Sequence, residues 1–194
     1  MFYIQFTKPI IEKSIACLLL VFFLPLMILI ALVNLLLYRN VFFIQVRAGF
    51  QMQSFRFVKF QTMRAATNLS DIHRMTNFGR FIRTTSLDEL PQLFQVLTGE
   101  MSLIGPRPLL ITYNTHYSDE QRKRFDVKPG ITGWAQVHGR NKISWKSRFQ
   151  YDNYYVKNVS FKLDMRILVE TIFQVLKFSE VNASDEETMK PFKK

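Results

Sequence analysis

The segment SLDELPQLF, residues 86–94, places two adjacent carboxylates, Asp88 and Glu89, where they could do chemistry. Ser86 and Glu89 have the spacing of a capping box, and Pro91 suits a first helical turn, so we expect a helix to begin here. The acids could then simply complement the helix dipole. Alternatively, adjacent carboxylates beside basic groups can hold a magnesium ion and attack a phosphate. These residues alone leave both readings open.

Several basic side chains could bind that phosphate. Arg107 stands in GPRP (Gly105–Pro108), where prolines on both sides fix the backbone and so present the guanidinium with little entropy to lose. Lys59 in KFQTMR and Arg140 in HGRN are further candidates. Together with the carboxylates, they predict a domain that handles a phosphorylated substrate.

The charge balance favours anionic partners. The chain has 26 Lys+Arg against 15 Asp+Glu, a net charge of +11, and eight basic residues against one acid lie between residues 39 and 83. A single cysteine, Cys17, excludes an internal disulfide framework and a cysteine-based zinc site. A membrane-tethered nucleic-acid binder would fit the charge, but no familiar nucleic-acid motif is present, so we expect anionic lipid and no nucleic acid.

One segment is apolar enough to enter a membrane. No charged residue occurs from Ser14 to Tyr38, and at about 1.5 Å per helical residue this run could cross the ~30 Å hydrocarbon core. No small-x-small cleavage pattern follows it, and a core helix this apolar would need a larger protein around it. Pro25 lies mid-segment and basic residues flank both ends. A helix bent at Pro25 that returns to the same face and a straight tilted span therefore both fit.

The remaining pattern predicts a helix-rich α+β domain. We expect a β-hairpin from residues 41–46 and 54–60, a helix over 87–97, a short charged helix over 119–125, and amphipathic helices over 145–156 and 161–178. Residues 128–140 contain three glycines and a proline and are predicted as loop. The predicted organisation is a membrane-inserted helix in residues 1–40, one compact catalytic domain in 41–180, and a loose tail in 181–194.

Five motifs, in this order, give the chain a specific resemblance: FIQVRAG, KFQTMR, TTSLDELPQLFQVLTGEMSLIGPRPLL, VKPGITGWAQVHGRN and YDNYYVKNVSFKLDMRIL. With them the chain resembles the small monotopic phosphoglycosyl transferases, bacterial sugar transferases that start glycan assembly on a polyprenyl carrier. The resemblance covers almost everything from the apolar segment to about Phe178, and the DELPQL and GPRP pieces are its most specific parts.

The resemblance implies a two-step transfer of a sugar-1-phosphate from a UDP-sugar to undecaprenyl (polyprenyl) phosphate, with release of UMP and a covalent aspartyl-phosphosugar intermediate. It makes Asp88 the nucleophile and metal ligand, Glu89 its partner, and Mg²⁺ the cofactor. Substrate contacts would come from a further set of side chains, namely Lys59, Arg107, Gln136, Arg140, Gln45 and Arg47.

The resemblance also bears on the membrane helix, because the family's helix is re-entrant and bends at a Ser-Pro pair. Here the pair is Leu24-Pro25, which lacks the serine hydroxyl. We expect both ends of the helix, and the catalytic domain, on the cytoplasmic face of the bacterial inner membrane; a homo-oligomer is compatible with this. The rival from another class is a catalytically silent scaffold for glycan-assembly enzymes, against which the intact Asp88, Glu89 and Arg107 argue.

Overall fold

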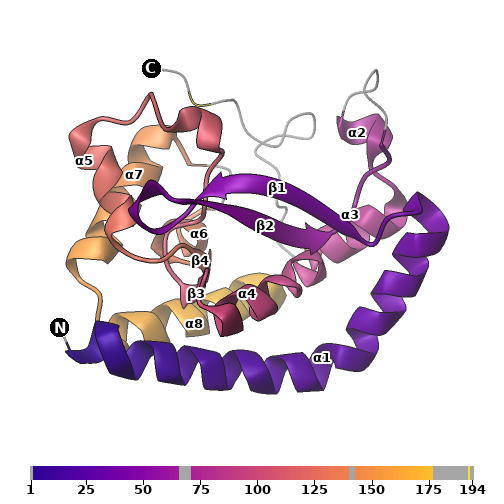
Figure 1. Ribbon diagram of the computed structural model, residues 1–194, viewed down its shortest axis with the longest axis horizontal. Helices are drawn as coiled ribbons and strands as arrows, with labels where there is room; N and C mark the ends of the chain where they lie inside the picture. Colours follow the sequence, from indigo (N-terminus) through magenta and orange to yellow (C-terminus); the bar gives the residue numbers. More distant parts are fainter. Residues whose placement is uncertain (1, 66–70, 140–142, 177–191, 193–194) are drawn as a thin grey trace.

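The protein is described from a computed structural model over residues 2–65, 71–139, 143–176 and 192. Eight α-helices occur in this described part: α1 (Lys8–Tyr38), α2 (Asp71–Arg74), α3 (Asn77–Thr84), α4 (Gln92–Thr98), α5 (Asp119–Arg122), α6 (Trp134–Val137), α7 (Trp145–Lys157) and α8 (Phe161–Leu176). Four short strands pair within the same ranges: β1 (Phe42–Ala48), β2 (Ser54–Phe60), β3 (Ser102–Ile104) and β4 (Gly130–Thr132). The expected helix-rich architecture with a small amount of sheet and a long apolar N-terminal helix is confirmed (Figure 1).

Helix α1 extends along one whole side of the molecule and changes direction along its length (Figure 1). With the π-helical turn before it, the stretch Tyr3–Tyr38 is long and apolar enough to cross a membrane, with a mean hydropathy of 3.1 in its most apolar window. Pro25 lies inside α1. Large apolar side chains such as Phe22 and Leu36 are 75% and 84% exposed. An apolar helix with this much exposed surface is not a soluble core helix, because that arrangement would leave its apolar face in water.

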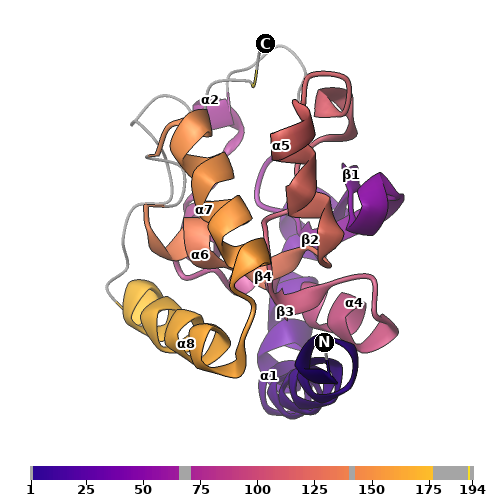
Figure 2. The same ribbon diagram turned by 90° about the vertical axis from the view of Figure 1, so that its left-hand side faces the viewer.

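Both ends of α1 are bonded to the rest of the chain. At the N-terminal end, Lys8 and Glu12 are buried, and Lys8 Nζ lies 2.8 Å from Asp164 Oδ2 of α8. At the C-terminal end, Asn34 donates to the Val41 carbonyl at 3.0 Å, and the Tyr38 hydroxyl donates to the Thr62 carbonyl at 3.3 Å. Helices α4 and α8 lie on either side of the N-terminal part of α1 (Figure 2). The same body therefore holds α1 at its two ends.

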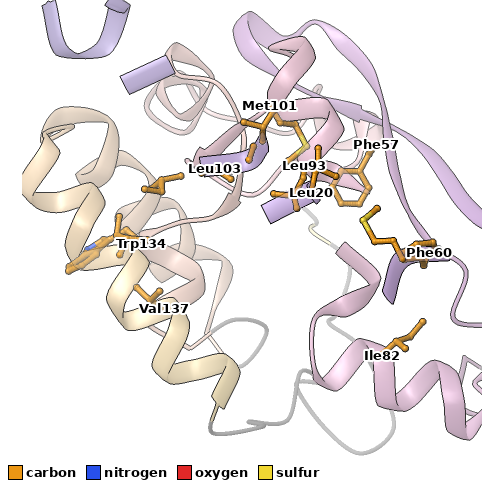
Figure 3. Close-up of a cluster of buried hydrophobic side chains, with 14 of the residues drawn as sticks. Leu20, Phe57, Phe60, Ile82, Leu93, Met101, Leu103, Trp134 and Val137 are labelled. Atoms are coloured by element: carbon orange, nitrogen blue, oxygen red, sulfur yellow. The ribbon is translucent and has the colours of Figure 1, made fainter. Parts of the chain in front are cut away.

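The hairpin β1–β2 is antiparallel, as predicted, with Phe42 opposite Phe60. Strand β2 turns Phe57 and Phe60 into the main core, where both are 1% exposed. There they join Leu93 of α4, Leu20 of α1 and buried apolar side chains from α3, β3, α6, α7 and α8 (Figure 3). Lys59 lies between Phe57 and Phe60 along β2, so the packing of these two phenylalanines in the core fixes the backbone on both sides of it.

The GPRP loop is held by a second, parallel strand pair, β3–β4, which the sequence did not predict. Ser102 pairs with Gly130 and Ile104 with Thr132, immediately before the loop. A Cβ on Gly105 would lie 2.3 Å from the Lys128 carbonyl oxygen, and one on Gly130 would lie 2.1 Å from the Gly105 nitrogen. Glycine is required here because the two backbones touch. Residues 128–140, predicted as loop, therefore contain β4 and α6.

The remaining helices differ from expectation in detail. Helices α7 and α8 form where amphipathic helices were predicted. The short charged helix consists of α5 followed by a 3₁₀ turn over Lys123–Asp126. Most of the predicted tail, residues 181–194, lies outside the described residues. Phe192 is described, and it is 9% exposed against an aromatic cluster that includes Tyr117 and Phe149.

Candidate active site

Asp88 lies in a tight 3₁₀ turn, Leu87–Glu89, that precedes α4. The predicted capping box is wrong: Ser86 has a left-handed backbone, with φ of 60°, and its side chain caps no backbone N–H. The helix is split, with α4 beginning only at Gln92. This geometry turns the Asp88 carboxylate inward, and the residue is 3% exposed. The two acids therefore precede α4 and do not lie in its first turn.

The Asp88 carboxylate faces a cation from the hairpin. Lys59 Nζ lies 3.4 Å from Asp88 Oδ2. Burial raises the pKa of Asp88 to about 6, against the opposing effect of the Lys59 charge. Burial likewise lowers the pKa of Lys59, and the charge of Asp88 opposes that shift. Asp88 is thus a poorly solvated carboxylate that is ionised above pH 6, which is the state a nucleophile requires.

Glu89 points to the GPRP loop and binds Arg107 with both oxygens. Arg107 Nη2 donates to Glu89 Oε1, and Nη1 donates to Oε2 at 3.3 Å. This two-pronged ion pair fixes the plane of the guanidinium. The pair holds the Arg107 cation against Glu89, the residue that follows Asp88 in the chain. Glu89 and Arg107 were predicted as two separate site residues, and their pairing was not predicted.

Gln45 and Arg47, expected to contact substrate, are bonded to each other, and Arg47 is also bonded to the GPRP loop. Arg47 Nη2 donates to Gln45 Oε1 at 2.7 Å, and Arg47 Nη1 donates to the Pro108 carbonyl at 2.9 Å. Burial lowers the pKa of Arg47 to about 10, and the neighbouring Arg107 charge acts in the same direction. In this structure Arg47 holds the loop.

A cavity of about 450 Å³ opens over Asp88. Four of the predicted site residues besides Asp88 line it: Lys59, Glu89, Arg107 and Gln136. Apolar side chains also line it, among them Leu19 and Phe23 of α1 and Ile172 and Val175 of α8. One cavity is therefore lined by both charged and apolar groups. Gln45, Arg47, Leu24 and Pro25 do not line it, and Arg140 lies outside the described residues.

Gln136 sits in the short helix α6 and is 9% exposed. Neither Nε2 nor Oε1 has a hydrogen-bond partner among the described residues. A buried amide without partners is costly, so it is expected to meet a polar ligand or water. Its position in the cavity wall agrees with the predicted substrate contact.

Sequence reasoning missed two further cations in the cavity wall. Arg83 lies in the last turn of α3, and its charge acts on Asp88 and Lys59. Arg148, in α7, is 2% exposed, and burial lowers its pKa to about 10. Neither lies inside the motifs on which the analysis rested, although Arg83 directly precedes the motif that begins at Thr84 and belongs to the excess of basic residues between 39 and 83.

The carboxylates can be compared with a metal site. No group of three or more His, Cys, Asp or Glu side chains suited to a metal occurs in the part of the chain that the structure describes. Mg²⁺ is commonly bound by one or two carboxylates together with substrate phosphates and water. Asp88 is compatible with that kind of shared site, whereas both Glu89 oxygens accept from Arg107.

A family model described as "Bacterial sugar transferase" matches residues 3–178, which include α1, the hairpin and every element around the cavity. The chain belongs to the bacterial sugar transferase family. The resemblance predicted from the motifs is thereby confirmed.

Members of the family resemble the chain to different extents. It is 46% identical over 168 residues to an uncharacterized sugar transferase, EpsL, of Bacillus subtilis, covering 84% of this chain and 83% of that protein. It is 41% identical over 191 residues to a UDP-glucose:undecaprenyl-phosphate glucose-1-phosphate transferase of Xanthomonas campestris pv. campestris, covering 90% of this chain and 40% of that protein. It is 49% identical over 104 residues to an undecaprenyl-phosphate galactose phosphotransferase of Salmonella typhimurium, covering 54% of this chain and 22% of that protein. The chain therefore spans less than half of these two named transferases.

Proposed function

We propose that this protein is a membrane-bound phosphoglycosyl transferase that moves a sugar-1-phosphate from a UDP-sugar to undecaprenyl phosphate. The observation that carries the proposal is the mixed lining of the cavity. Its charged side chains suit a diphosphate, and its apolar side chains from α1 and α8 suit a prenyl chain. The names of the Xanthomonas and Salmonella relatives support both substrates.

In the proposed reaction, an Asp88 oxygen attacks the sugar-linked phosphorus of the UDP-sugar. The bond from that phosphorus to the bridging oxygen breaks, and UMP leaves with the electron pair. An oxygen of undecaprenyl phosphate then attacks the same phosphorus and releases the Asp88 carboxylate, so the product is undecaprenyl-diphosphate-sugar. A covalent intermediate lets the water-soluble and the lipid substrate use one cavity in turn.

The surrounding residues have separate tasks in this scheme. Lys59 keeps the buried Asp88 carboxylate ionised, and Arg107 offers its guanidinium to the phosphate while Glu89 orients it. Arg83, Arg148 and Gln136 supply further polar groups in the wall. Mg²⁺, held by Asp88 together with phosphate oxygens, would offset the charge that develops on them.

The proposal is tested by UMP release from a panel of UDP-sugars with protein in lipid nanodiscs, Mg²⁺ and undecaprenyl phosphate. We expect one or a few sugars to release UMP and Asp88→Asn to abolish the release. Asp119→Asn is the matched control, because Asp119 is exposed on α5. Without the lipid substrate, wild-type protein should release about one UMP per chain and gain the mass of a phosphosugar.

Each alternative has its own signature in this assay. Turnover that survives Asp88→Asn would refute the covalent step. A folded wild-type protein that releases no UMP from any sugar would favour the scaffold. Loss of UMP release in EDTA, with recovery on adding Mg²⁺, is expected if the metal proposal is right, and unchanged release would contradict it.

We further propose that α1 is re-entrant, bends at Leu24-Pro25, and keeps both ends and the catalytic domain in the cytoplasm at the inner membrane. The support is that one body binds both ends: Lys8 bonds to Asp164, and Tyr38 bonds to Thr62. A straight span would carry Lys8 to the other face of the bilayer, away from its buried partner.

The topology is tested by cysteine labelling in whole cells. In a Cys17→Ser background, Gln5→Cys places a thiol at an exposed position before α1. We expect a membrane-impermeant maleimide to label it only after the cells are opened. Labelling in intact cells would overturn the re-entrant topology.

A further inference from the structure

Two arginines from different elements bind successive carbonyl groups of the GPRP loop. Arg47 Nη1, from β1, donates to the Pro108 carbonyl at 2.9 Å. Arg124 Nη2, from the 3₁₀ turn Lys123–Asp126, donates to the Arg107 carbonyl at 2.7 Å. Arg124 thus bonds to the backbone of Arg107, the same residue whose side chain binds Glu89. The Arg107 carbonyl is therefore held by Arg124, while the Arg107 side chain lines the cavity.

Arg124 is itself held rigidly. Its Nε and Nη2 both donate to Asp152 Oδ2 of α7, at 3.0 and 2.9 Å. Arg124 and Asp152 are each 2% exposed. The guanidinium carbon also lies 5.3 and 5.9 Å from the ring centroids of Phe125 and Phe149. Arg124 has little freedom to turn away from the loop, because charge, hydrogen bonds and aromatic rings all surround it.

We propose that Arg124, oriented by Asp152, is a positioning residue that sets where the Arg107 guanidinium meets the sugar-linked phosphate. Pro106 and Pro108 restrict the backbone on either side of Arg107, so fixing its carbonyl also fixes the direction of its Cα–Cβ bond. An arginine fork binds a phosphate well only in a narrow range of geometry, and a displacement of about 1 Å can cost about a hundredfold in rate. The inference rests on the proposed function, because it names a residue that supports the same reaction.

The test must separate positioning from simple loss of folded protein. Arg124→Gln removes the hydrogen bond to the Arg107 carbonyl. It also leaves the Asp152 carboxylate buried without the guanidinium that neutralises it, so it will lower stability as well. The double variant Arg124→Gln/Asp152→Asn removes both charges together and should recover much of that stability. Arg124→Lys keeps the charge but cannot serve Asp152 and the Arg107 carbonyl at once. Arg122→Gln is the matched control, because the Arg122 side chain is 51% exposed and its nearest carboxylate contact is 4.0 Å away.

Steady-state kinetics of UMP release separate an effect on KM for the UDP-sugar from an effect on kcat. We expect the double variant, at a temperature where it is folded, to have a KM for the UDP-sugar raised about tenfold or more. Arg124→Lys should show the same rise, and Arg122→Gln should match wild type. A merely structural role would lower the active fraction, and so kcat, and leave KM unchanged. A folded double variant with the wild-type KM would overturn the proposal.

A second measurement does not depend on the reaction. Hydrogen–deuterium exchange of the peptide that covers residues 105–111 should be faster in the double variant, whereas peptides from α7 stay protected. Faster exchange in the double variant, together with a folded wild-type protein that releases no UMP, would refute the proposed function and leave the loop bond established. Unchanged exchange would refute the positioning role. In an Arg107→Gln background, adding the Arg124 change should lower kcat/KM no further, and an additive loss would also count against it.

Discussion

The contact of Lys8 with the catalytic body allows a quantitative prediction. Its Nζ lies 2.6 Å from Glu12 Oε1, 2.8 Å from Asp164 Oδ2 and 3.2 Å from the Ile104 carbonyl. Lys8→Met removes this cation and leaves two buried carboxylates side by side. Both keep neutral donors, since Ser102 donates to Glu12 and the Tyr155 hydroxyl donates to Asp164, but neither donor supplies positive charge.

Breaking a buried ion pair from one side costs about 3–5 kcal/mol. For a chain of this size, each kcal/mol lowers Tm by roughly 2–4 °C, so we expect Lys8→Met to lower Tm by roughly 6–20 °C. Lys13→Met, on an exposed position of the same helix, should change stability by less than about 0.5 kcal/mol.

Thermal unfolding in nanodiscs at pH 8 is the assay. Lys8→Met/Asp164→Asn should recover part of the loss at pH 8, because it leaves one buried carboxylate instead of two. The reasoning is refuted if Lys8→Met unfolds at the same temperature as Lys13→Met at this pH.

Three further predictions concern the core, the nucleophile and the lipid wall. Gly79→Ala should destabilise the fold by about 1–3 kcal/mol, measured as a fall in Tm, because the added Cβ would lie 2.0 Å from the rigid Thr62 carbonyl oxygen; an unchanged Tm would contradict this close approach. The kcat/KM for UMP release should fall as pH drops through about 6, because burial raises the pKa of Asp88 to that value and only the ionised carboxylate attacks; a flat profile down to pH 5 would contradict the assignment. Ile172→Asp should raise the KM for undecaprenyl phosphate by about tenfold, because it puts a charge in the apolar wall, and should leave the UMP burst without lipid intact; loss of the burst would show that the wall serves the first step instead.

Local patterns predicted much of the fold. The alternation in residues 54–60 gave the β2 strand, and the apolar periodicity after Phe161 gave α8. The region around Asp88 was harder to predict. The S-x-x-E spacing suggested a capped helix, whereas Ser86 adopts a left-handed backbone and Glu89 binds Arg107 instead of the cap. A tertiary ion pair and the burial of Asp88 override the local preference of a capping box, which is worth only about 1 kcal/mol.

The sequence by itself determined the apolar segment and the family and predicted a set of candidate site residues, because these reside in motifs and in uninterrupted runs of residues. Only the tertiary structure decided what those residues contact. Tyr3 and Asp164 are 161 positions apart, and Arg124 and Asp152 are 28 positions apart, so no local pattern pairs them. Likewise, Arg47 holds the GPRP loop instead of lining the cavity because the hairpin brings it to Pro108, 61 positions further along the chain. Charge and residue type can be read from a sequence, but the partner that neutralises each buried charge is chosen by packing.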